Sequence, residues 1–165
     1  MQVNSVPVSS PSLRRQSEGN PEMSNTGLPQ FDETLHLTNT WLKEIMVQME
    51  WEDRRHAYRA LRSTLHALRD RITVSEGARL AAQLPLMIKG VFYDGWSPGR
   101  CGEGHRSLET FLTPVTDAFD KDPRTRAIDV ARAVMKVLHR HVSAGEMQDV
   151  IQALPEPIRR ALSED

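Results

Sequence analysis

The 165-residue chain contains a single cysteine, Cys101, and this scarcity limits the sites it can build. One cysteine cannot form an internal disulfide or a multi-cysteine zinc site. Aromatic residues make up only 5% of the chain. No apolar run approaches the roughly 18 residues of a membrane-spanning helix, and the N-terminus lacks the apolar core of a secretory signal. These absences favour a cytoplasmic protein that folds around an ordinary hydrophobic core.

Charge of either sign is balanced, with 21 Lys and Arg against 22 Asp and Glu and a net charge of −1. The whole chain therefore has no electrostatic bias toward nucleic acid or membranes. Enzyme motifs are absent as well, because the sequence has no phosphate-binding glycine loop, no Gly-x-Ser-x-Gly and no His-Glu-x-x-His. We expect a protein without enzymatic activity, without a cofactor and without a bound metal.

The first part of the chain, residues 1–37, is predicted to be a disordered tail. Ser, Asn, Pro and Gly dominate it up to about residue 32, and no apolar residues recur at helical or strand spacing. Such a segment buries too little apolar surface to offset its conformational entropy. Translation starting at Met23 is an alternative. Residues 38–163 are predicted to form one all-helical domain.

Helical periodicity begins at Thr38 and predicts a first helix over 39–49 and a second over 53–71. The second helix carries one apolar stripe, which consists of Ala57, Leu61, Leu65, Leu68 and Ile72. Thr73-Val-Ser-Glu76 is a capping box that starts a third helix. That helix ends at Leu84, because Pro85 cannot continue it but suits the first position of a new helix.

The same pattern returns 70 residues later, where residues 111–162 align with 41–92 without a gap. The capping box recurs as Ser143-Ala-Gly-Glu146 and the corner as Leu154-Pro155. The apolar pairs in register are Trp41 with Phe111, Leu42 with Leu112, Met49 with Phe119, Leu65 with Met135, Leu68 with Leu138 and Ile72 with Val142. We therefore predict an all-α bundle of about eight helices, made of two tandem four-helix units related by a pseudo-twofold axis and joined by loop 93–107.

The second unit departs from the first near its start. Pro114 falls inside its first helix, which either kinks there or begins at Thr113 with Pro114 in its first turn. Asp122-Pro123 is predicted to supply the N-cap and the first residue of the unit's long helix.

The stretch WEDRRHAYRALRSTLHALRDRITVSEGARLAAQLPLMIKGVFYDGW, residues 51–96, resembles the bacterial family of domains of unknown function numbered 2267. Trp51-Glu-Asp-Arg54, Ala82-Gln-Leu-Pro85 and Gly95-Trp96 carry the resemblance, which extends over about residues 38–162. It implies a small all-helical bacterial protein and supplies no catalytic or binding residues.

Basic side chains gather on one face of the second predicted helix. They are spaced by 4, 3, 4 and 3 residues and form what we call the basic stripe: Arg55, Arg59, Arg62, His66 and Arg69. They share an arc of about 80°, and no acidic residue of this helix falls inside it. The stripe is a candidate site for an acidic partner surface or nucleic-acid phosphate, and an ordinary solvated face is the alternative. The matching residues of the second unit are Thr125, Asp129, Arg132, Lys136 and His139.

The glycine-rich linker contains residue types that binding sites use, and its candidate surface consists of Tyr93, Trp96, Arg100 and His105. Cys101 lies four residues from His105, but nothing in the sequence orients this histidine as a base. The leading prediction is a non-enzymatic, cytoplasmic protein-interaction module with a protein partner, for which a stress-related role is one option. A nucleic-acid-binding accessory protein that uses the basic stripe is the alternative. An enzyme with a polar pocket at 93–105 comes third.

Overall fold

The computed structural model describes residues 26–100 and 106–163, which form eight α-helices, one 3₁₀ turn and no strand. The all-helical class is therefore confirmed for the described part of the chain. The helices are α1 (Pro29–Met49), α2 (Arg54–Arg69), α3 (Val74–Ala82), α4 (Leu86–Tyr93), α5 (Leu108–Ala118), α6 (Ala127–His141), α7 (Ala144–Ala153) and α8 (Glu156–Ser163). The 3₁₀ turn, η1 (Pro98–Arg100), lies in the linker.

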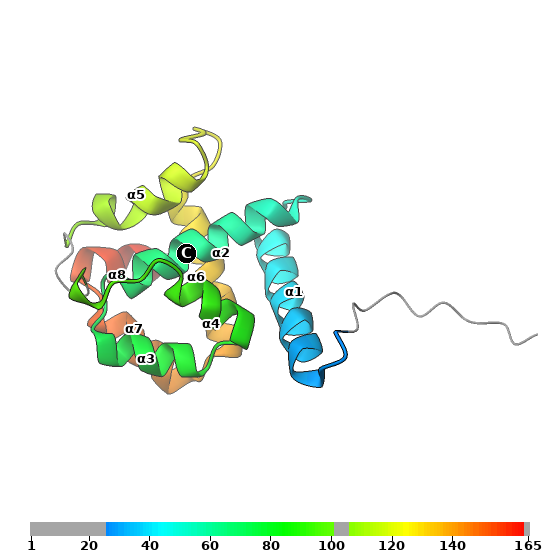
Figure 1. The fold of residues 1–165 in the computed structure, drawn as a ribbon. Coiled ribbons are helices and arrows are strands. Elements are labelled where there is room, and N and C mark those ends of the chain that lie inside the picture. Colours follow the sequence, from blue (N-terminus) through cyan, green and yellow to red (C-terminus); the bar gives the residue numbers. More distant parts are fainter. Residues whose placement is uncertain (1–25, 101–105, 164–165) are drawn as a thin grey trace, which may run out of the picture.

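Helix α2 lies in the middle of the bundle and contacts α1, α4, α5 and α6. Figure 1 shows α5 on one side of α2 and the α3 and α7 pair on the other, with α1 crossing near the start of α2. Helix α6 also contacts α1, α5, α7 and α8. Helices α2 and α6, which correspond to the long helices predicted for the two units, thus form the centre around which the other helices pack.

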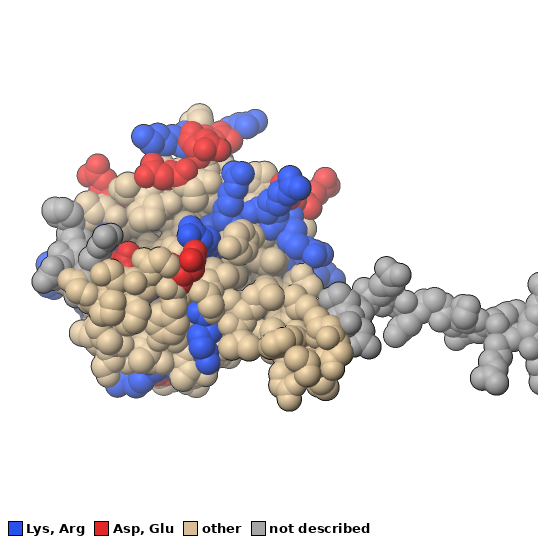
Figure 2. All heavy atoms as spheres, in the orientation of Figure 1, with Lys and Arg blue, Asp and Glu red and all other residues tan. Residues whose placement is uncertain are grey.

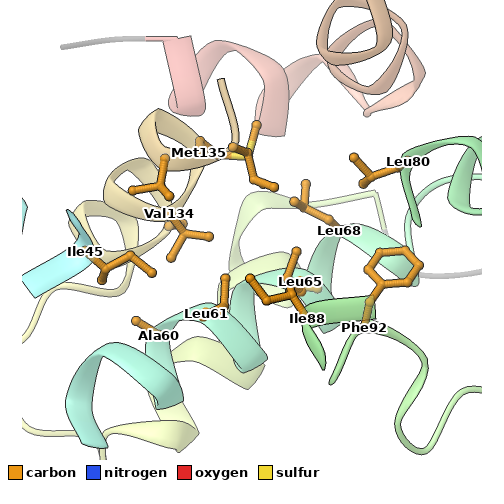
Figure 3. Packing of buried hydrophobic residues seen from close by; sticks show 14 of the residues in the cluster. Ile45, Ala60, Leu61, Leu65, Leu68, Leu80, Ile88, Phe92, Val134 and Met135 are labelled. Carbon is orange, nitrogen blue, oxygen red and sulfur yellow. The ribbon is translucent and has the colours of Figure 1, made fainter. Parts of the chain in front are cut away.

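The core forms where the predicted apolar stripe of α2 meets α6 and the helices around them. Leu65 and Leu68 of α2 are fully buried, as is Leu138 of α6. Figure 3 shows Leu65 and Leu68 among side chains from several helices, including Val134 and Phe92. Burying each such side chain contributes about 1.5–3 kcal/mol, so the stripe predicted from the sequence is a main source of the fold's stability.

The two predicted helix corners are confirmed. Pro85 separates α3 from α4, and its carbonyl accepts the first helical hydrogen bond, from the Lys89 N–H at 2.8 Å. Pro155 does the same between α7 and α8, accepting from the Arg159 N–H at 3.0 Å. Each proline therefore caps its helix from just outside, one position before the predicted one. Leu84 and Leu154 are buried beside them.

Of the two predicted capping boxes, one is complete and the other is half formed. Thr73 and Glu76 exchange both hydrogen bonds, at 3.3 and 2.8 Å. Ser143 Oγ accepts from the Glu146 N–H at 3.4 Å, but the Ser143 N–H donates to Gln83 Oε1 at 2.8 Å. Gln83, at the end of α3, replaces the glutamate and ties α3 to α7.

The first helix begins at Pro29, ten residues before its predicted start, so residues 29–37 were wrongly assigned to the tail. The reason is that threonines form the buried face here. Thr34 and Thr38 are buried, and Thr38 Oγ1 donates to the Thr34 carbonyl at 2.7 Å. Thr34 Oγ1 also accepts from the Met87 N–H at 2.9 Å. A hydropathy pattern does not register such residues as core. The rest of the predicted tail is residues 1–28, of which 1–25 lie outside the described residues.

The predicted start of the second unit's long helix at Asp122-Pro123 is wrong, because α6 begins at Ala127. Asp122 instead organises a turn: its Oδ1 accepts from the Arg124 N–H at 3.0 Å, and its carbonyl accepts from the Thr125 N–H at 3.0 Å. A short acidic side chain that bonds backbone two residues ahead favours turns as readily as helix caps. Helices α2 and α3 also end two residues before their predicted ends, at Arg69 and Ala82.

Pro114 lies inside α5, so a helix start at Thr113 is wrong. The helix starts earlier because Ser107 caps it, accepting from the Thr110 N–H at 3.3 Å. A proline has no N–H for the carbonyl four residues before it, which here belongs to Thr110. Arg71 supplies the missing donor, since its Nη2 lies 2.9 Å from the Thr110 carbonyl oxygen. Burial lowers the pKa of the Arg71 guanidinium from its usual range.

Because the Arg71 side chain takes the place of a backbone N–H, we predict that its contribution to the free energy of unfolding depends on Pro114. Arg71→Met should cost about 1 kcal/mol, a value reduced for the partial exposure of the guanidinium. In a Pro114→Ala background the restored N–H satisfies Thr110, so the same change should cost about half as much. Urea unfolding of the two single variants and the double variant measures this coupling. Equal losses in both backgrounds would show that Arg71 does not serve the proline.

Candidate functional site

The structure divides the basic stripe of α2 into an inward part and an outward part. Arg69 is 6% exposed and His66 is half-buried, whereas Arg55, Arg59 and Arg62 are exposed. All five residues lie on α2 as predicted, but they do not share one environment.

Arg69 holds the end of α4 and the start of the linker. Its Nη1 donates to the carbonyl oxygens of Phe92 at 2.6 Å and Asp94 at 2.8 Å, and its Nε lies 3.0 Å from Asp70 Oδ1. A buried guanidinium is costly without such partners. The last carbonyls of a helix carry the negative end of its dipole and favour a cation. Arg69 is therefore a structural cap of α4.

His66 and Arg62 act on the same end of α4. His66 Nε2 donates to the Val91 carbonyl at 2.7 Å. Burial lowers the pKa of His66, the charges of Arg69 and Arg62 lower it further, and the hydrogen bond to Val91 opposes them. Arg62 Nη2 lies 2.8 Å from Asp94 Oδ2, and this contact lowers the pKa of the Asp94 carboxyl.

Acidic residues from other elements face the stripe. No acid of α2 falls on it, but Asp94 reaches Arg62 and Asp120 lies 3.8 Å from Arg59 Nη1. Asp94 is 32 residues away from Arg62 along the chain, and Asp120 belongs to the loop between α5 and α6. The helical wheel of a single helix could not reveal either carboxylate.

The outward part of α2 is centred on Tyr58, which the sequence analysis did not select. We call Arg54, Arg55, Tyr58 and Arg59 the Tyr58 face. The Tyr58 side chain is 43% exposed. Tyr58 and Arg59 border two grooves, one of about 770 Å³ toward Leu42 of α1 and one of about 360 Å³ toward Pro114 of α5. The sequence signal that could have identified Tyr58 is an aromatic residue on this helix that lies off its apolar stripe.

Charge on this side of the molecule is mixed. Figure 2 shows lysine and arginine side chains grouped near the start of α2, with acidic side chains close by at the α5 end. Arg54 Nη1 donates to Asn39 Oδ1 of α1 at 3.2 Å. Arg55 forms no ion pair within residues 26–100 or 106–163. The Tyr58 face therefore exposes an aromatic ring next to arginine side chains.

The linker candidates are only partly described. Tyr93 ends α4, and its ring packs edge-on against Phe92 and lies 5.1 Å, between ring centroids, from Trp96. Both Tyr93 and Trp96 are half-buried. Arg100 belongs to η1, while His105 and Cys101 lie outside the described residues.

Among the described residues, no three His, Cys, Asp or Glu side chains gather closely enough to hold a metal ion. The ring of His141 stacks on Trp41, and its Nε2 lies 2.9 Å from Glu44 Oε1. None of the described helices combines the length and apolar character required to span a bilayer.

The chain belongs to the family described as uncharacterized conserved protein (DUF2267), whose sequence model matches residues 38–161. The resemblance predicted from the sequence is therefore confirmed over nearly the same residues. No curated protein matches the chain.

The His66 environment predicts a pH dependence of stability. Because the folded-state pKa lies below the usual 6.5, the unfolded chain binds more protons as the pH falls. The contribution of His66 is therefore fully present above pH 6.5 and is lost as the pH falls through the folded-state value. His66→Gln retains an N–H donor but cannot titrate, so its free energy of unfolding should fall less between pH 8 and about pH 5. Parallel curves for the wild type and the variant would contradict this assignment.

Proposed function

We propose that this DUF2267 protein is a non-enzymatic, cytoplasmic interaction module that binds an acidic protein partner through the Tyr58 face. The observation that carries the proposal is the exposed Tyr58 ring, which lies between two grooves beside Arg55 and Arg59. Tyrosine and arginine are enriched among the residues that contribute most to protein–protein binding. A rigid helix presents them here, which limits the entropy lost on binding.

The arginines of the face are available for a partner's carboxylates. The Arg59 and Asp120 side chains are 46% and 91% exposed, and so exposed a pair at 3.8 Å stabilises the fold little. Arg59 can exchange Asp120 for another carboxylate at small cost. Guanidinium groups bind carboxylates in a two-pronged geometry, which favours an acidic protein surface over a merely apolar one.

The neighbouring acids favour protein over nucleic acid as the partner. Asp53, Asp94 and Asp120 lie beside the arginines of α2. A nucleic-acid backbone carries a charge at every phosphate, so these carboxylates would face repulsion along it. A protein surface can place cations opposite them.

We also propose that the bundle is a tandem duplication with a pseudo-twofold axis. Helix starts support it: α3 and α7 begin at Val74 and Ala144, and α4 and α8 begin at Leu86 and Glu156, each 70 residues apart. Contacts between helices support it as well. The contact of α1 with α6 corresponds to that of α5 with α2, and the contact of α2 with α4 corresponds to that of α6 with α8. Helix α3 also contacts α7, its own counterpart.

Complementary volumes give the duplication independent support. A methyl group on Gly77 would lie 3.8 Å from the ring of Phe92, which is fully buried. At the matching positions, Met147 is buried and Leu162 is half-buried. Gly77 and Phe92 of the first unit therefore correspond to Met147 and Leu162 of the second, an exchange of side-chain volume between matching positions that two copies of one unit can accommodate.

The functional test compares capture of partners from the native host. The Tyr58→Ala, Arg59→Glu double variant should lose a partner that the wild type retains, with its melting temperature nearly unchanged because both side chains are exposed. Lys43→Glu, an exposed charge reversal on α1, is the control and should retain the partner. Mass spectrometry identifies the protein, and titration with the purified partner should reproduce the loss.

Random-sequence duplex DNA serves as the competing ligand. If the wild type binds DNA with a steep salt dependence and DNA displaces the captured protein, the nucleic-acid alternative replaces our proposal. If the double variant captures everything that the wild type captures, the Tyr58 face is an ordinary solvated surface.

A further inference from the structure

The start of α7 is capped by a side chain from another helix. Gln83, the residue that follows α3, accepts the Ser143 N–H at its Oε1 (2.8 Å), and its Nε2 donates to Ser143 Oγ at 3.1 Å. Helices α3 and α7 contact each other and lie side by side in Figure 1. We call this contact the α3–α7 junction. The two bonds of Gln83 are the shortest polar contacts across it in the described part of the chain.

The residue that ordinarily completes such a cap is present at the junction but does not serve it. In a capping box the glutamate three residues after the cap accepts the N–H of the capping residue, and here that glutamate is Glu146. Its Oε1 is buried without a hydrogen-bond partner among the described residues. Its Oε2 lies 3.9 Å from Arg79 Nε, beyond hydrogen-bond distance, and the side chain is 9% exposed. Burial of a carboxylate with so few partners is unfavourable.

The backbone at Ser143 is already arranged for Glu146 to cap it. Ser143 has φ −58 and ψ 146, close to φ −69 and ψ 161 at Thr73, where the box is complete. There the Thr73 N–H donates to Glu76 Oε2 at 2.8 Å. The other half of the box exists at Ser143 too, because its Oγ accepts from the Glu146 N–H. Only the Glu146 side chain has to turn once Gln83 leaves the Ser143 N–H.

Gln83 and Glu146 therefore compete for a single donor. Each would place an oxygen on the Ser143 N–H, and one hydrogen does not serve both oxygens well. The position 70 residues after Gln83 is Ala153, whose side chain has no polar atom, and Thr73 keeps its own Glu76. The competition thus belongs to the start of α7.

We propose that the α3–α7 junction is a latch with two capped states. In the closed state, which the structure shows, Gln83 caps α7 and Glu146 is buried. In the open state α3 has moved away from α7, and Glu146 lies in water and caps Ser143 in place of Gln83. Helix α7 is capped in both states, and opening relieves the burial of the carboxylate, which keeps the two states close in free energy. The contacts of α1 with α6 and of α2 with α5 hold the two halves together while the latch opens. The latch does not depend on the Tyr58 face.

Spin labels on the full chain measure the opening as a distance between α3 and α7. The labels are attached at Ala78→Cys and Gln148→Cys, both exposed positions, in a Cys101→Ser background. Gln83→Ala should raise the ratio of open to closed molecules about tenfold, because the closed state loses two hydrogen bonds.

Glu146→Ala, added to Gln83→Ala, decides between a latch and an ordinary contact. It should lower the ratio of open to closed molecules about fivefold, because the open state loses its cap and the closed state loses the buried carboxylate. If Glu146 were only an ion-pair partner of Arg79, its removal would weaken the junction and raise the ratio. The two accounts therefore predict changes of opposite sign.

Asp149→Ala is the matched control in the same background. Asp149 Oδ2 also lies 3.9 Å from Arg79, at Nη2, but Asp149 is not placed to cap Ser143. Its removal should not lower the ratio of open to closed molecules.

Hydrogen exchange of the Ser143 amide in the unlabelled chain is an independent measurement. In Gln83→Ala its rate should stay within about threefold of the wild type, since Glu146 takes over the N–H, and it should rise about tenfold further when Glu146→Ala is added. Three results would overturn the proposal: a single distance in Gln83→Ala, an equal fall of the ratio with Asp149→Ala and with Glu146→Ala, and a Ser143 amide that exchanges as fast in Gln83→Ala as in the double variant.

Discussion

The end of α4 and the direction of the linker depend on one buried guanidinium. Arg69 lies at the end of α2, and its Nη1 binds the carbonyls of Phe92 and Asp94, where α4 ends and the linker begins. Those carbonyls have no partner within their own helix, so a donor from elsewhere must meet them. Because Arg69 is held in the core beside Phe92, it fixes both the end of α4 and the direction in which the chain leaves it.

This constraint decides what the basic stripe can do. Residues that appear equivalent on a helical wheel are used differently: Arg69 and His66 face the α4 terminus, Arg62 pairs with the linker, and Arg55 and Arg59 remain outside. The outside pair, with Tyr58 between them, takes no part in the α4 cap, and we propose it as the partner-binding surface.

The fold was largely predictable because its signals are local. The apolar stripe of α2, the Thr73 capping box and the corners at Pro85 and Pro155 depend on neighbours within one or two helical turns. The error at Asp122 is local, because its side chain forms a turn instead of a helix cap, but the other errors have nonlocal causes. Thr34 accepts from the Met87 N–H of α4, and the Ser143 N–H donates to Gln83 of another helix. Pro114 is tolerated because Arg71 bonds the Thr110 carbonyl, which the proline leaves without a backbone donor. The candidate site was half predictable for the same reason, since Asp94 and Asp120 approach the stripe only after folding.

Hydrogen exchange of the α4 end in Arg69→Met tests the central claim most directly. With the donor removed, the amides of residues 91–96 should exchange faster, while those of α6, which does not depend on this cap, should keep their protection. Arg55→Met, the matched change at an exposed position of the same helix, should leave both regions unchanged. If Arg69→Met leaves residues 91–96 as protected as in the wild type, Arg69 does not hold the α4 end and the account of the stripe is wrong.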